Sequence, residues 1–302
     1  MPQKITVWAI VATFYGFKCI IEHLVAVQTN NEIGSEVDDW TYRLFVKHPH
    51  LFLPILENQE PKGEGEATAL ERIFEEFKVP PRAKILDFSC GIGTHSINLA
   101  KRGYQVVGCD PSPFYIEIAK QTAIEKIVDT QTEIRFYQVE ALKATDVLLA
   151  KDERDFNGMI IFHSLGFLGE AQDIQILKNI SKLAAANCIL VIETENRDWV
   201  IHNLQPQVKL DLGNLEIHET WRFNLETSTA ESRSKFYEKN VNDTSLRLVL
   251  DLNTSIRLYS LHELIRIINS AGWKYVKSMG DIITLEQAAS GIPDILTISR
   301  KI

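Results

Sequence analysis

Residues 84–113 read KILDFSCGIGTHSINLAKRGYQVVGCDPSP, and this stretch decides the fold. An apolar run leads into a turn with two glycines, a helix-forming segment follows, and a second apolar run ends at Asp110. Gly91 and Gly93 lack a Cβ atom, so a ligand can approach the backbone of the turn closely. A carboxylate such as Asp110 can accept hydrogen bonds from both hydroxyls of a ribose. The layout predicts a strand, turn, helix and strand around a nucleotide-type cofactor.

The residues of the turn distinguish two cofactor classes. A dinucleotide-binding turn follows G-x-G-x-x-G and receives an anionic pyrophosphate. Here Asp87 opens the turn, and Ser96 stands where the third glycine would be. Asp87 would lie unfavourably beside a pyrophosphate but suits a cationic amino group. A nicotinamide-dependent dehydrogenase is therefore disfavoured. The turn resembles motif I of the class I S-adenosylmethionine (SAM) dependent methyltransferases, D-x-G-x-G-x-G, with Ser89 in place of the first glycine.

This resemblance covers residues 83–193 and implies SAM as the cofactor. In that family the turn packs under the methionine part of SAM, the acid after the second strand holds the ribose, and residues after the third strand lie near the adenine. The fourth strand ends beside the reacting methyl group. By position, the implied cofactor-binding residues are Asp87, Cys90, Gly91, Gly93, Asp110, Pro111, Ser112, Glu140, Ala141, His163 and Leu165.

Asp110 also has a structural interpretation, as the N-cap of the helix that follows it. Ser112 is the better cap, because Pro113 then takes the first helical position, where proline is favoured. This assignment leaves Asp110 for the ribose.

Composition narrows the class of partner. The chain has 302 residues, 45% of them apolar and 24% charged, as in ordinary globular proteins. Its formal charge of −8 gives little attraction for phosphate backbones, so a nucleic-acid partner is unfavoured and a small molecule is expected. The four cysteines form no C-x-x-C pair, which indicates reduced thiols in the cytoplasm. The histidines show no metal-binding spacing, and we expect no metal.

The N-terminus is apolar but short for a membrane helix. Residues 5–14 resemble the core of a signal peptide, yet Lys18, Glu22 and His23 interrupt the run before the ~20 apolar residues that a span needs. We expect an amphipathic helix on the domain or on a partner, and no membrane. An export signal and a misassigned start are the alternatives.

The order of elements predicts an α/β fold. We expect an N-terminal helical lid over residues 1–60, with a polar hinge at 58–65, and a cofactor-binding domain over 61–302. Strands and helices alternate from 84 to 193, which implies a parallel sheet covered on both faces. The prediction is a Rossmann-like, doubly wound sheet of seven strands. Three long antiparallel strands, at about 213–259, form an inserted flap in which Ile217, Glu219, Trp221 and Phe223 share one face.

Residues 257–273, RLYSLHELIRIINSAGW, follow this flap and begin with a helix capped by Ser260. They resemble the R-x-Y-[ST]-x-x-E-L…A-G-[FW] ending of methyltransferases related to the glycine, sarcosine and sugar N-methyltransferases. That resemblance implies a small-molecule acceptor.

His163 is the candidate base or acceptor-orienting group, because it ends the fourth strand and its neutral form is well populated near pH 7. Lining the cofactor pocket is its alternative role. Tyr42 and Arg43 lie where related enzymes carry a lid, and a guanidinium matches the methionine carboxylate, although a solvated helix face explains them equally. The acceptor candidates on the inserted strands are Trp221, Arg222, Tyr237, Arg257 and Tyr259.

Two properties of these strands leave the acceptor open. Arginines facing a pocket favour an acidic acceptor, whereas aromatic residues favour a planar or cationic one. Long amphipathic strands also make dimer interfaces, so a homodimer through them is an alternative role, above all for Trp221.

The leading hypothesis is a cytoplasmic SAM-dependent methyltransferase that acts on a nitrogen or oxygen nucleophile of a small molecule. An RNA or protein methyltransferase and a non-catalytic SAM-binding protein are the alternatives. The tetrapeptide N-P-P-[FYW] of adenine and glutamine N-methyltransferases is absent after the fourth strand, where the sequence reads HSLG.

Overall fold

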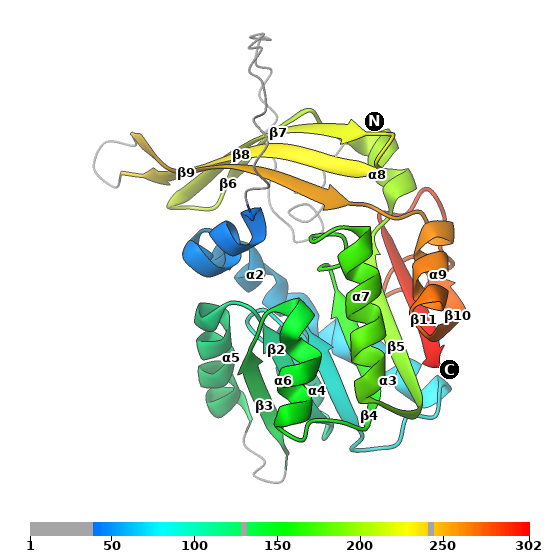
Figure 1. The fold of residues 1–302 in the computed structure, drawn as a ribbon. Helices are drawn as coiled ribbons and strands as arrows, with labels where there is room; N and C mark the ends of the chain where they lie inside the picture. The colour runs from blue at the N-terminus through cyan, green and yellow to red at the C-terminus, as the bar shows by residue number, and fades with distance from the viewer. Residues whose placement is uncertain (1–38, 128–131, 241–244) are drawn as a thin grey trace.

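The structure is a computed structural model that describes residues 39–127, 132–240 and 245–302. An α/β body forms the lower part of Figure 1, an antiparallel sheet forms the upper part, and a short helical segment lies between them. The N-terminal helix, export-signal and start-site predictions fall on residues 1–38, outside the described part of the chain.

The body contains a seven-stranded sheet with the order β10-β11-β5-β4-β1-β2-β3. Strands β1 to β5 pair in parallel, whereas β11 runs antiparallel to both β5 and β10. This is the predicted Rossmann-like α/β fold. The bounds are β1 Lys84–Phe88, β2 Gln105–Asp110, β3 Ile134–Gln138, β4 Phe156–Phe162, β5 Ala184–Glu195, β10 Trp273–Met279 and β11 Asp294–Lys301.

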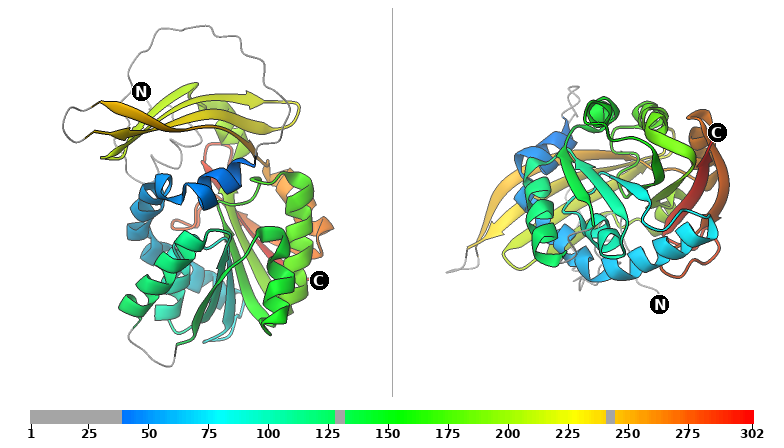
Figure 2. Two further views of the ribbon diagram at one scale, coloured as in Figure 1. Left: turned by 60° about the vertical axis from the view of Figure 1, so that its left-hand side comes forward. Right: turned by 90° about the horizontal axis from the view of Figure 1, so that it is seen from below.

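Helices cover both faces of this sheet (Figure 2), which explains why its central strands are apolar on both sides. Helices α3, α4 and α5 pack on one face, and α6, α7 and α9 pack on the other. Their bounds are α3 Gly63–Glu76, α4 Thr94–Lys101, α5 Pro113–Lys126, α6 Ala144–Ala150, α7 Glu170–Ile180 and α9 Leu261–Ser270, with short 3₁₀ turns η4 Ala141–Lys143 and η5 Ser181–Leu183.

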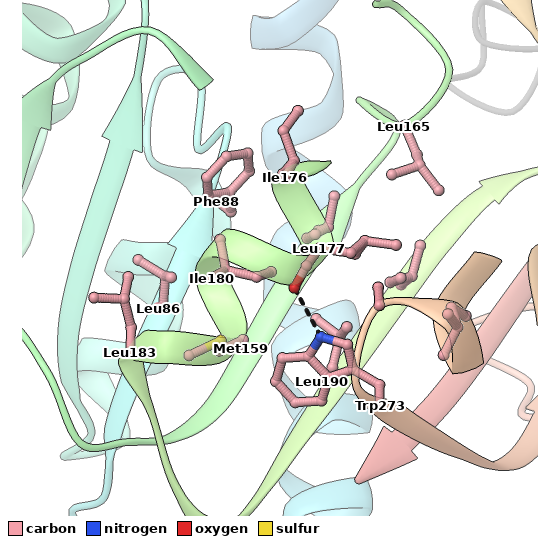
Figure 3. Close-up of a cluster of buried hydrophobic side chains, with 14 of the residues drawn as sticks. Leu86, Phe88, Met159, Leu165, Ile176, Leu177, Ile180, Leu183, Leu190 and Trp273 are labelled. Carbon is pink, nitrogen blue, oxygen red and sulfur yellow. Dashed lines mark hydrogen bonds between the residues drawn. The ribbon is translucent and has the colours of Figure 1, made fainter. Parts of the chain in front are cut away.

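A cluster of large apolar side chains fills the space between the sheet and α7 (Figure 3). Trp273 is fully buried there, and its indole N–H donates to the carbonyl oxygen of Leu177 at 3.0 Å. The tail that follows the inserted strands is therefore part of the core of the body.

Both predicted helix caps are confirmed. The Ser112 hydroxyl accepts from the Tyr115 N–H at 3.4 Å, with Pro113 in the first turn. Ser260 and Glu263 form a reciprocal capping box at the start of α9. Asp110 is consequently not needed as the cap of α5.

The segment between body and upper sheet is the lid, which we define as residues 40–62. It contains a π-helix η1 Tyr42–Lys47, the 3₁₀ turn η2 Pro49–Leu51, the helix α2 Leu53–Gln59 and the 3₁₀ turn η3 Glu60–Lys62. The polar turn predicted at 58–65 is helical instead, because η3 leads directly into α3. The Cβ position of Gly63 would lie 2.3 Å from the Thr94 side chain, so this glycine lets α3 begin against α4.

The upper sheet has four antiparallel strands, in the order β6-β7-β8-β9, where three were predicted. The additional strand, β6, has only five residues, so its alternating pattern is too short to stand out in the sequence. The bounds are β6 Gln207–Asp211, β7 Leu215–Asn224, β8 Thr229–Lys239 and β9 Leu246–Arg257, and a helix α8 Arg197–Asn203 links β5 to β6.

One face of the upper sheet packs on the lid and on α8 (Figure 1). Ile217, Glu219 and Trp221 are buried on this inner face, as the period-two pattern predicts. The lid is therefore held between the sheet above it and the carboxyl edge of the body below it.

Candidate functional site

The glycine turn after β1 has a left-handed backbone at three positions, Ser89, Gly91 and Gly93, with φ of 62°, 54° and 82°. A Cβ atom on Gly93 would lie 3.0 Å from the Cβ of Ala119 and 3.1 Å from the ring of Phe136, so both its φ and its surroundings require glycine. The turn crosses the end of β2, because the Cys90 N–H donates to the Cys109 carbonyl at 3.0 Å.

Asp110 ends β2 directly beside this turn. Its Oδ2 accepts from the Gly91 N–H at 3.0 Å, and its Oδ1 accepts from the Ser112 N–H at 2.9 Å. Burial raises the pKa of this carboxyl to about 6, although both backbone hydrogen bonds favour the ionised form. A carboxylate has about four lone-pair sites, so two remain for a vicinal diol.

Asp87 lies beneath the turn and is only 2% exposed. Its Oδ2 accepts from the Ser96 hydroxyl at 2.6 Å. Burial raises its pKa, and the charge of His95 and the Ser96 hydrogen bond oppose that shift. Ser96 thus uses its hydroxyl on Asp87 at the position where a dinucleotide-binding turn has its third glycine.

His163 follows β4 with a φ of 48°, which is uncommon for a residue other than glycine. Its N–H donates to the Glu193 carbonyl at 2.9 Å, so the backbone continues the pairing of β4 with β5. The ring lies between two carboxylates of β5. Nε2 is 3.5 Å from Oε2 of Glu193, and Nδ1 is 3.5 Å from Oε1 of Glu195.

The two carboxylates respond differently to this histidine. Burial raises the pKa of Glu193 despite the hydrogen bond and charge of His163. Burial also acts to raise the pKa of Glu195, but the hydrogen bond and charge of His163 hold it below its ordinary value. Glu195 is therefore the acid that His163 keeps ionised.

A glycine turn, a ribose-type carboxylate and a strand-end histidine now lie along one edge of a Rossmann-like sheet. The family model described as "Methyltransferase domain" matches residues 64–278, well over half of the chain. The chain belongs to the methyltransferase-domain family. Residues 64–278 thus form a SAM-dependent methyltransferase domain of class I, as the motif predicts.

Solved structures share the fold of this methyltransferase. A SAM-dependent methyltransferase of Clostridium acetobutylicum superposes with a TM-score of 0.68 at 10% identity, covering 84% of this chain and 98% of that one. The CcbJ methyltransferase of Streptomyces caelestis gives 0.64 at 15% identity, over 80% and 90%. The sugar N-methyltransferase KedS8 of Streptoalloteichus gives 0.55 at 14% identity, over 92% and 98%.

Two curated relatives match in sequence over a shorter region. They are the tRNA (uracil(54)-C(5))-methyltransferases of Pyrococcus abyssi, 37% identical over 71 residues, and of Pyrococcus horikoshii, 41% identical over 105 residues. These matches cover 24% and 33% of this methyltransferase, which spans only 18% and 23% of the length of the two relatives.

The edge residues of this methyltransferase fit SAM. Asp110 has acceptor sites left for ribose hydroxyls, and the turn beside it has no Cβ atom at Gly91 and Gly93. The lid reaches this place as well. Leu56 lies 3.7 Å from where a Cβ of Gly91 would be, and the Tyr115 hydroxyl donates to the Pro49 carbonyl at 2.9 Å.

The other predicted cofactor residues are placed as follows. Ala141 starts η4, and Glu140 pairs with Lys143 at 2.7 Å at the exposed end of β3. Pro111 accepts at its carbonyl from the Gln138 side chain at 3.2 Å. Leu165 is buried and belongs to the apolar cluster between the sheet and α7 (Figure 3).

Tyr42 and Arg43 of the lid have different surroundings. Tyr42 is 55% exposed. The Arg43 guanidinium donates to the Asp251 carbonyl of β9 at 3.2 Å, so it ties the lid to the upper sheet.

The structure does not bring the five predicted acceptor residues together. Trp221 lies inside the molecule, where its Nε1 donates to Glu219 at 3.1 Å, so it is not the exposed dimer contact considered for it. Arg222 pairs with Glu231 on the exposed face of the sheet. Tyr237 shares that outer face, 4.9 Å from the ring of His218.

Arg257 and Tyr259 do lie together, as period two predicts, but within the body. The guanidinium is 4.6 Å from the Tyr259 ring and pairs with Glu170 at 3.1 Å and Glu263 at 2.7 Å. The fully buried Tyr259 donates to Asp173 at 2.6 Å. These contacts satisfy both side chains, so the acidic acceptor that free arginines would favour is not supported.

Sequence reasoning missed four acids of the site: Glu66, Glu193, Glu195 and Asp294. A usable signal for two of them is the E-T-E run at 193–195, which places alternate acids at the end of a buried strand. Glu66 is 2.7 Å from His95 Nε2, and this contact raises the His95 pKa although burial acts to lower it. Only the fold brings Glu66 and Asp294 to this edge.

Within the described ranges, no helix is long and apolar enough to cross a membrane. In the same part of the chain, no group of three or more His, Cys, Asp or Glu side chains is arranged to hold a metal ion.

Proposed function

We propose that this methyltransferase transfers a methyl group to a nitrogen or oxygen nucleophile of a small molecule, with His163 orienting or deprotonating the acceptor. The observation that supports it is the ring of His163, held between Glu193 and Glu195 at the end of β4. The formal charge of −8 favours a small molecule over a phosphate backbone. A sugar N-methyltransferase is among the proteins that share the fold.

SAM supplies an electrophilic methyl group on a positively charged sulfur. The chain contributes mainly by positioning, which can lower a barrier by about 7 to 11 kcal/mol when reacting groups are held in line. In this proposal Asp110 accepts from the ribose hydroxyls, and the turn at Gly91 and Gly93 supports the methionine part. Asp87 stabilises that turn through Ser96, and Glu140 and Ala141 lie at the adenine end.

His163 has a distinct role from these binding residues. The two flanking carboxylates fix the ring plane, and Glu195 can stabilise a proton on Nδ1. A ring held in this way can accept a proton from an acceptor hydroxyl or ammonium through one nitrogen. General-base help of this kind typically contributes about 10²- to 10⁴-fold.

The test is a methyl-transfer screen with His163→Gln. The full chain is incubated with SAM and pooled amines, alcohols and acids, and release of S-adenosylhomocysteine is measured for each pool. We expect transfer to at least one small molecule and a fall of about 10²-fold in kcat for the variant. Binding of S-adenosylhomocysteine, measured by calorimetry, should stay within about twofold.

His262→Gln is the matched control, because His262 is exposed on α9, away from the edge. Unfractionated tRNA forms a separate arm, since the curated relatives act on tRNA by name. Transfer to tRNA alone would overturn the small-molecule proposal. Equal kcat in His163→Gln and His262→Gln would remove His163 from the reaction.

A further inference from the structure

The carboxyl edge continues beyond His163 to a carboxylate that no step above uses. Asp294 begins β11 and pairs in register with Glu195 of the antiparallel neighbour β5. Residues directly opposite in an antiparallel pair project to the same face of the sheet. Glu193, two residues before Glu195, projects to this face too. Three carboxyl groups from two strands therefore gather beside His163.

Asp294 is only 7% exposed, and its side chain makes no hydrogen bond or ion pair with the described part of the chain. Burial raises its pKa well above the ordinary value; the charge of His163 opposes this, and the neighbouring acids add to it. A buried carboxyl group without a partner is costly. Its retention at an edge that binds ligands points to a partner supplied by a ligand.

The backbone around this acid is held firmly. The Asn196 side chain donates to the carbonyls of Ala289 and Ile292, at 2.9 and 2.8 Å, just before β11 begins. The Asn196 N–H donates to the Pro293 carbonyl at 2.6 Å. Asp294 and Glu195 are thus fixed relative to each other before any ligand arrives, as a preformed binding site requires.

Charge around the three carboxyls is unbalanced. His163 is the basic group between them, and the groups that interact with them from other elements include acids and bases. The acids are Glu66 of α3, Glu193 and Glu195 of β5, Asp281 after β10 and Asp294 of β11, and the bases are Lys62 of η3, His95 of α4 and His163 after β4. With all five acids ionised they outnumber the three bases, so an added cation would stabilise the ionised form of the carboxyls whose pKa burial raises.

The strand order indicates which ligand brings that cation. Asp110 ends β2, the glycine turn follows β1, His163 follows β4, and the acids lie on β5 and β11, in this order across the sheet. A cofactor that starts with its ribose at β2 and continues over the turn at β1 presents its methyl group near β4. The strands beyond β4 are then on the acceptor side.

We propose that Glu195 and Asp294 bind a protonated amino group of the methyl acceptor beside His163. This inference rests on the proposed function, because it names the chemical class of the acceptor for the same site. Two carboxylates suit an ammonium group, which has three donors and no acceptor. Before transfer the ammonium loses one proton to a carboxylate or to His163, and the freed nitrogen lone pair becomes the nucleophile.

The first arm of the test measures binding without turnover. The full chain, saturated with S-adenosylhomocysteine, is titrated in the calorimeter with n-propylamine hydrochloride, n-propanol or sodium propionate at equal ionic strength. We expect the amine to bind at least about tenfold more tightly than the alcohol or the acid. Equal binding of the three compounds, or tighter binding of propionate, overturns the proposal.

The second arm repeats the titration on two isosteric variants, Asp294→Asn and Glu195→Gln. Each should weaken binding of the amine by about tenfold or more, and leave the Kd for S-adenosylhomocysteine within about twofold. Asp146→Asn and Glu125→Gln are the matched controls, since both side chains are exposed on helices of the body. If one variant fails to fold, as judged by circular dichroism, amine binding by the other variant still tests the proposal.

The two arms also separate the cofactor from the acceptor as the source of the ammonium. S-Adenosylhomocysteine carries its own amino group. If the variants lose affinity for S-adenosylhomocysteine and keep affinity for n-propylamine, the acids serve the cofactor and the proposal is overturned. If n-propylamine binds as expected while the screen finds no transfer to a small molecule, the proposed function fails and this site stands.

Discussion

Asp110 shows how a single carboxylate can link the cofactor turn to the pH of the solution. Both of its oxygens already accept backbone N–H groups, and burial raises its pKa to about 6. Only the ionised form keeps all acceptor sites for ribose hydroxyls. We therefore expect affinity for S-adenosylhomocysteine to fall as the pH drops from 7.5 to 5.5, by calorimetry at each pH.

Asp110→Asn provides the control for this pH dependence. An amide keeps the size of the side chain but has one acceptor oxygen, so the affinity should fall by about tenfold or more at pH 7.5. It also does not ionise, so the remaining affinity should be flat between the two pH values. A variant with the wild-type pH profile would assign the titration to another group.

Glu219 is the most unusual buried acid of the upper sheet. It accepts from Trp221 Nε1 at 3.1 Å and from the Ser234 hydroxyl at 2.9 Å, on an inner face that is mostly apolar but also buries a few hydroxyl groups. Burial raises its pKa from the ordinary 4.5 to about 8. The folded state therefore keeps a proton that the unfolded state loses between these values, and stability contributed by this group falls as pH rises through that window.

Glu219→Gln removes this titration. The variant should be close to wild type at pH 5 and more stable at pH 8 by a few kcal/mol, since each unit of pKa shift is worth about 1.4 kcal/mol. Urea unfolding at both pH values measures the difference. Glu226→Gln, on an exposed turn, is the control and should change stability equally at the two pH values. If Glu219→Gln also changed stability equally at pH 5 and pH 8, Glu219 would not retain its proton on folding.

Among single residues, the sequence predicted those site residues that stand at the carboxyl ends of apolar strands. Asp110 ends such a strand and His163 follows one, and the carboxyl ends of parallel strands meet at one edge. Asp294 could not be found in this way, because it begins an antiparallel strand whose start meets that edge only after folding. Leu165 lies in the core cluster, because an apolar residue after a strand can turn back into the core.

The loop after β4 depends on one glycine for its contact with the end of β9. A Cβ atom on Gly166 would lie 2.0 Å from the Arg257 carbonyl oxygen, and its φ is 92°. The same glycine donates to Asp173 at 2.8 Å and accepts from the Arg257 N–H at 3.0 Å. We expect Gly166→Ala to destabilise the fold by about 3 kcal/mol or more in urea unfolding, through strain and the clash together.

Gly103→Ala separates these two causes. Gly103 has a similar φ of 89°, but nothing lies within 4 Å of its Cβ position. Gly103→Ala should lower the free energy of unfolding only by the strain of a left-handed backbone, about 1 to 2 kcal/mol. If Gly166→Ala and Gly103→Ala lost the same free energy of unfolding, the loop after β4 would be able to move away from β9.

Elements with strong periodicity were predicted well, and the others depended on their neighbours. β7 alternates over ten residues and was found, whereas β6 has two apolar residues and is recruited by pairing with β7. The polar run at 58–65 reads as a turn. It is helical because Gly63 allows α3 to begin against Thr94.

For the whole molecule, the remaining predictions concern assembly and location. The outer face of the upper sheet carries ion pairs, Arg222 with Glu231 and Arg233 with Asp251, so it is charged and open to solvent. An obligate dimer interface is usually more apolar than this. The homodimer through the inserted strands and the cytoplasmic location stay predictions.

The whole fold should be stabilised by the adenosyl ligand, because in the proposed site it would lie where the lid contacts the body, at the Gly91 turn and near Tyr115. A ligand that binds only the folded state at 100 times its Kd adds about 2.7 kcal/mol. In a chain of this size that is a rise of about 5 °C in Tm.

NAD at the same concentration should give no rise, because Asp87 and Ser96 replace the features that receive a pyrophosphate. Differential scanning fluorimetry of wild type and Asp110→Asn measures both effects. A rise with S-adenosylhomocysteine that is lost in the variant ties the stabilisation to Asp110, whereas an equal rise with NAD would contradict the choice of cofactor.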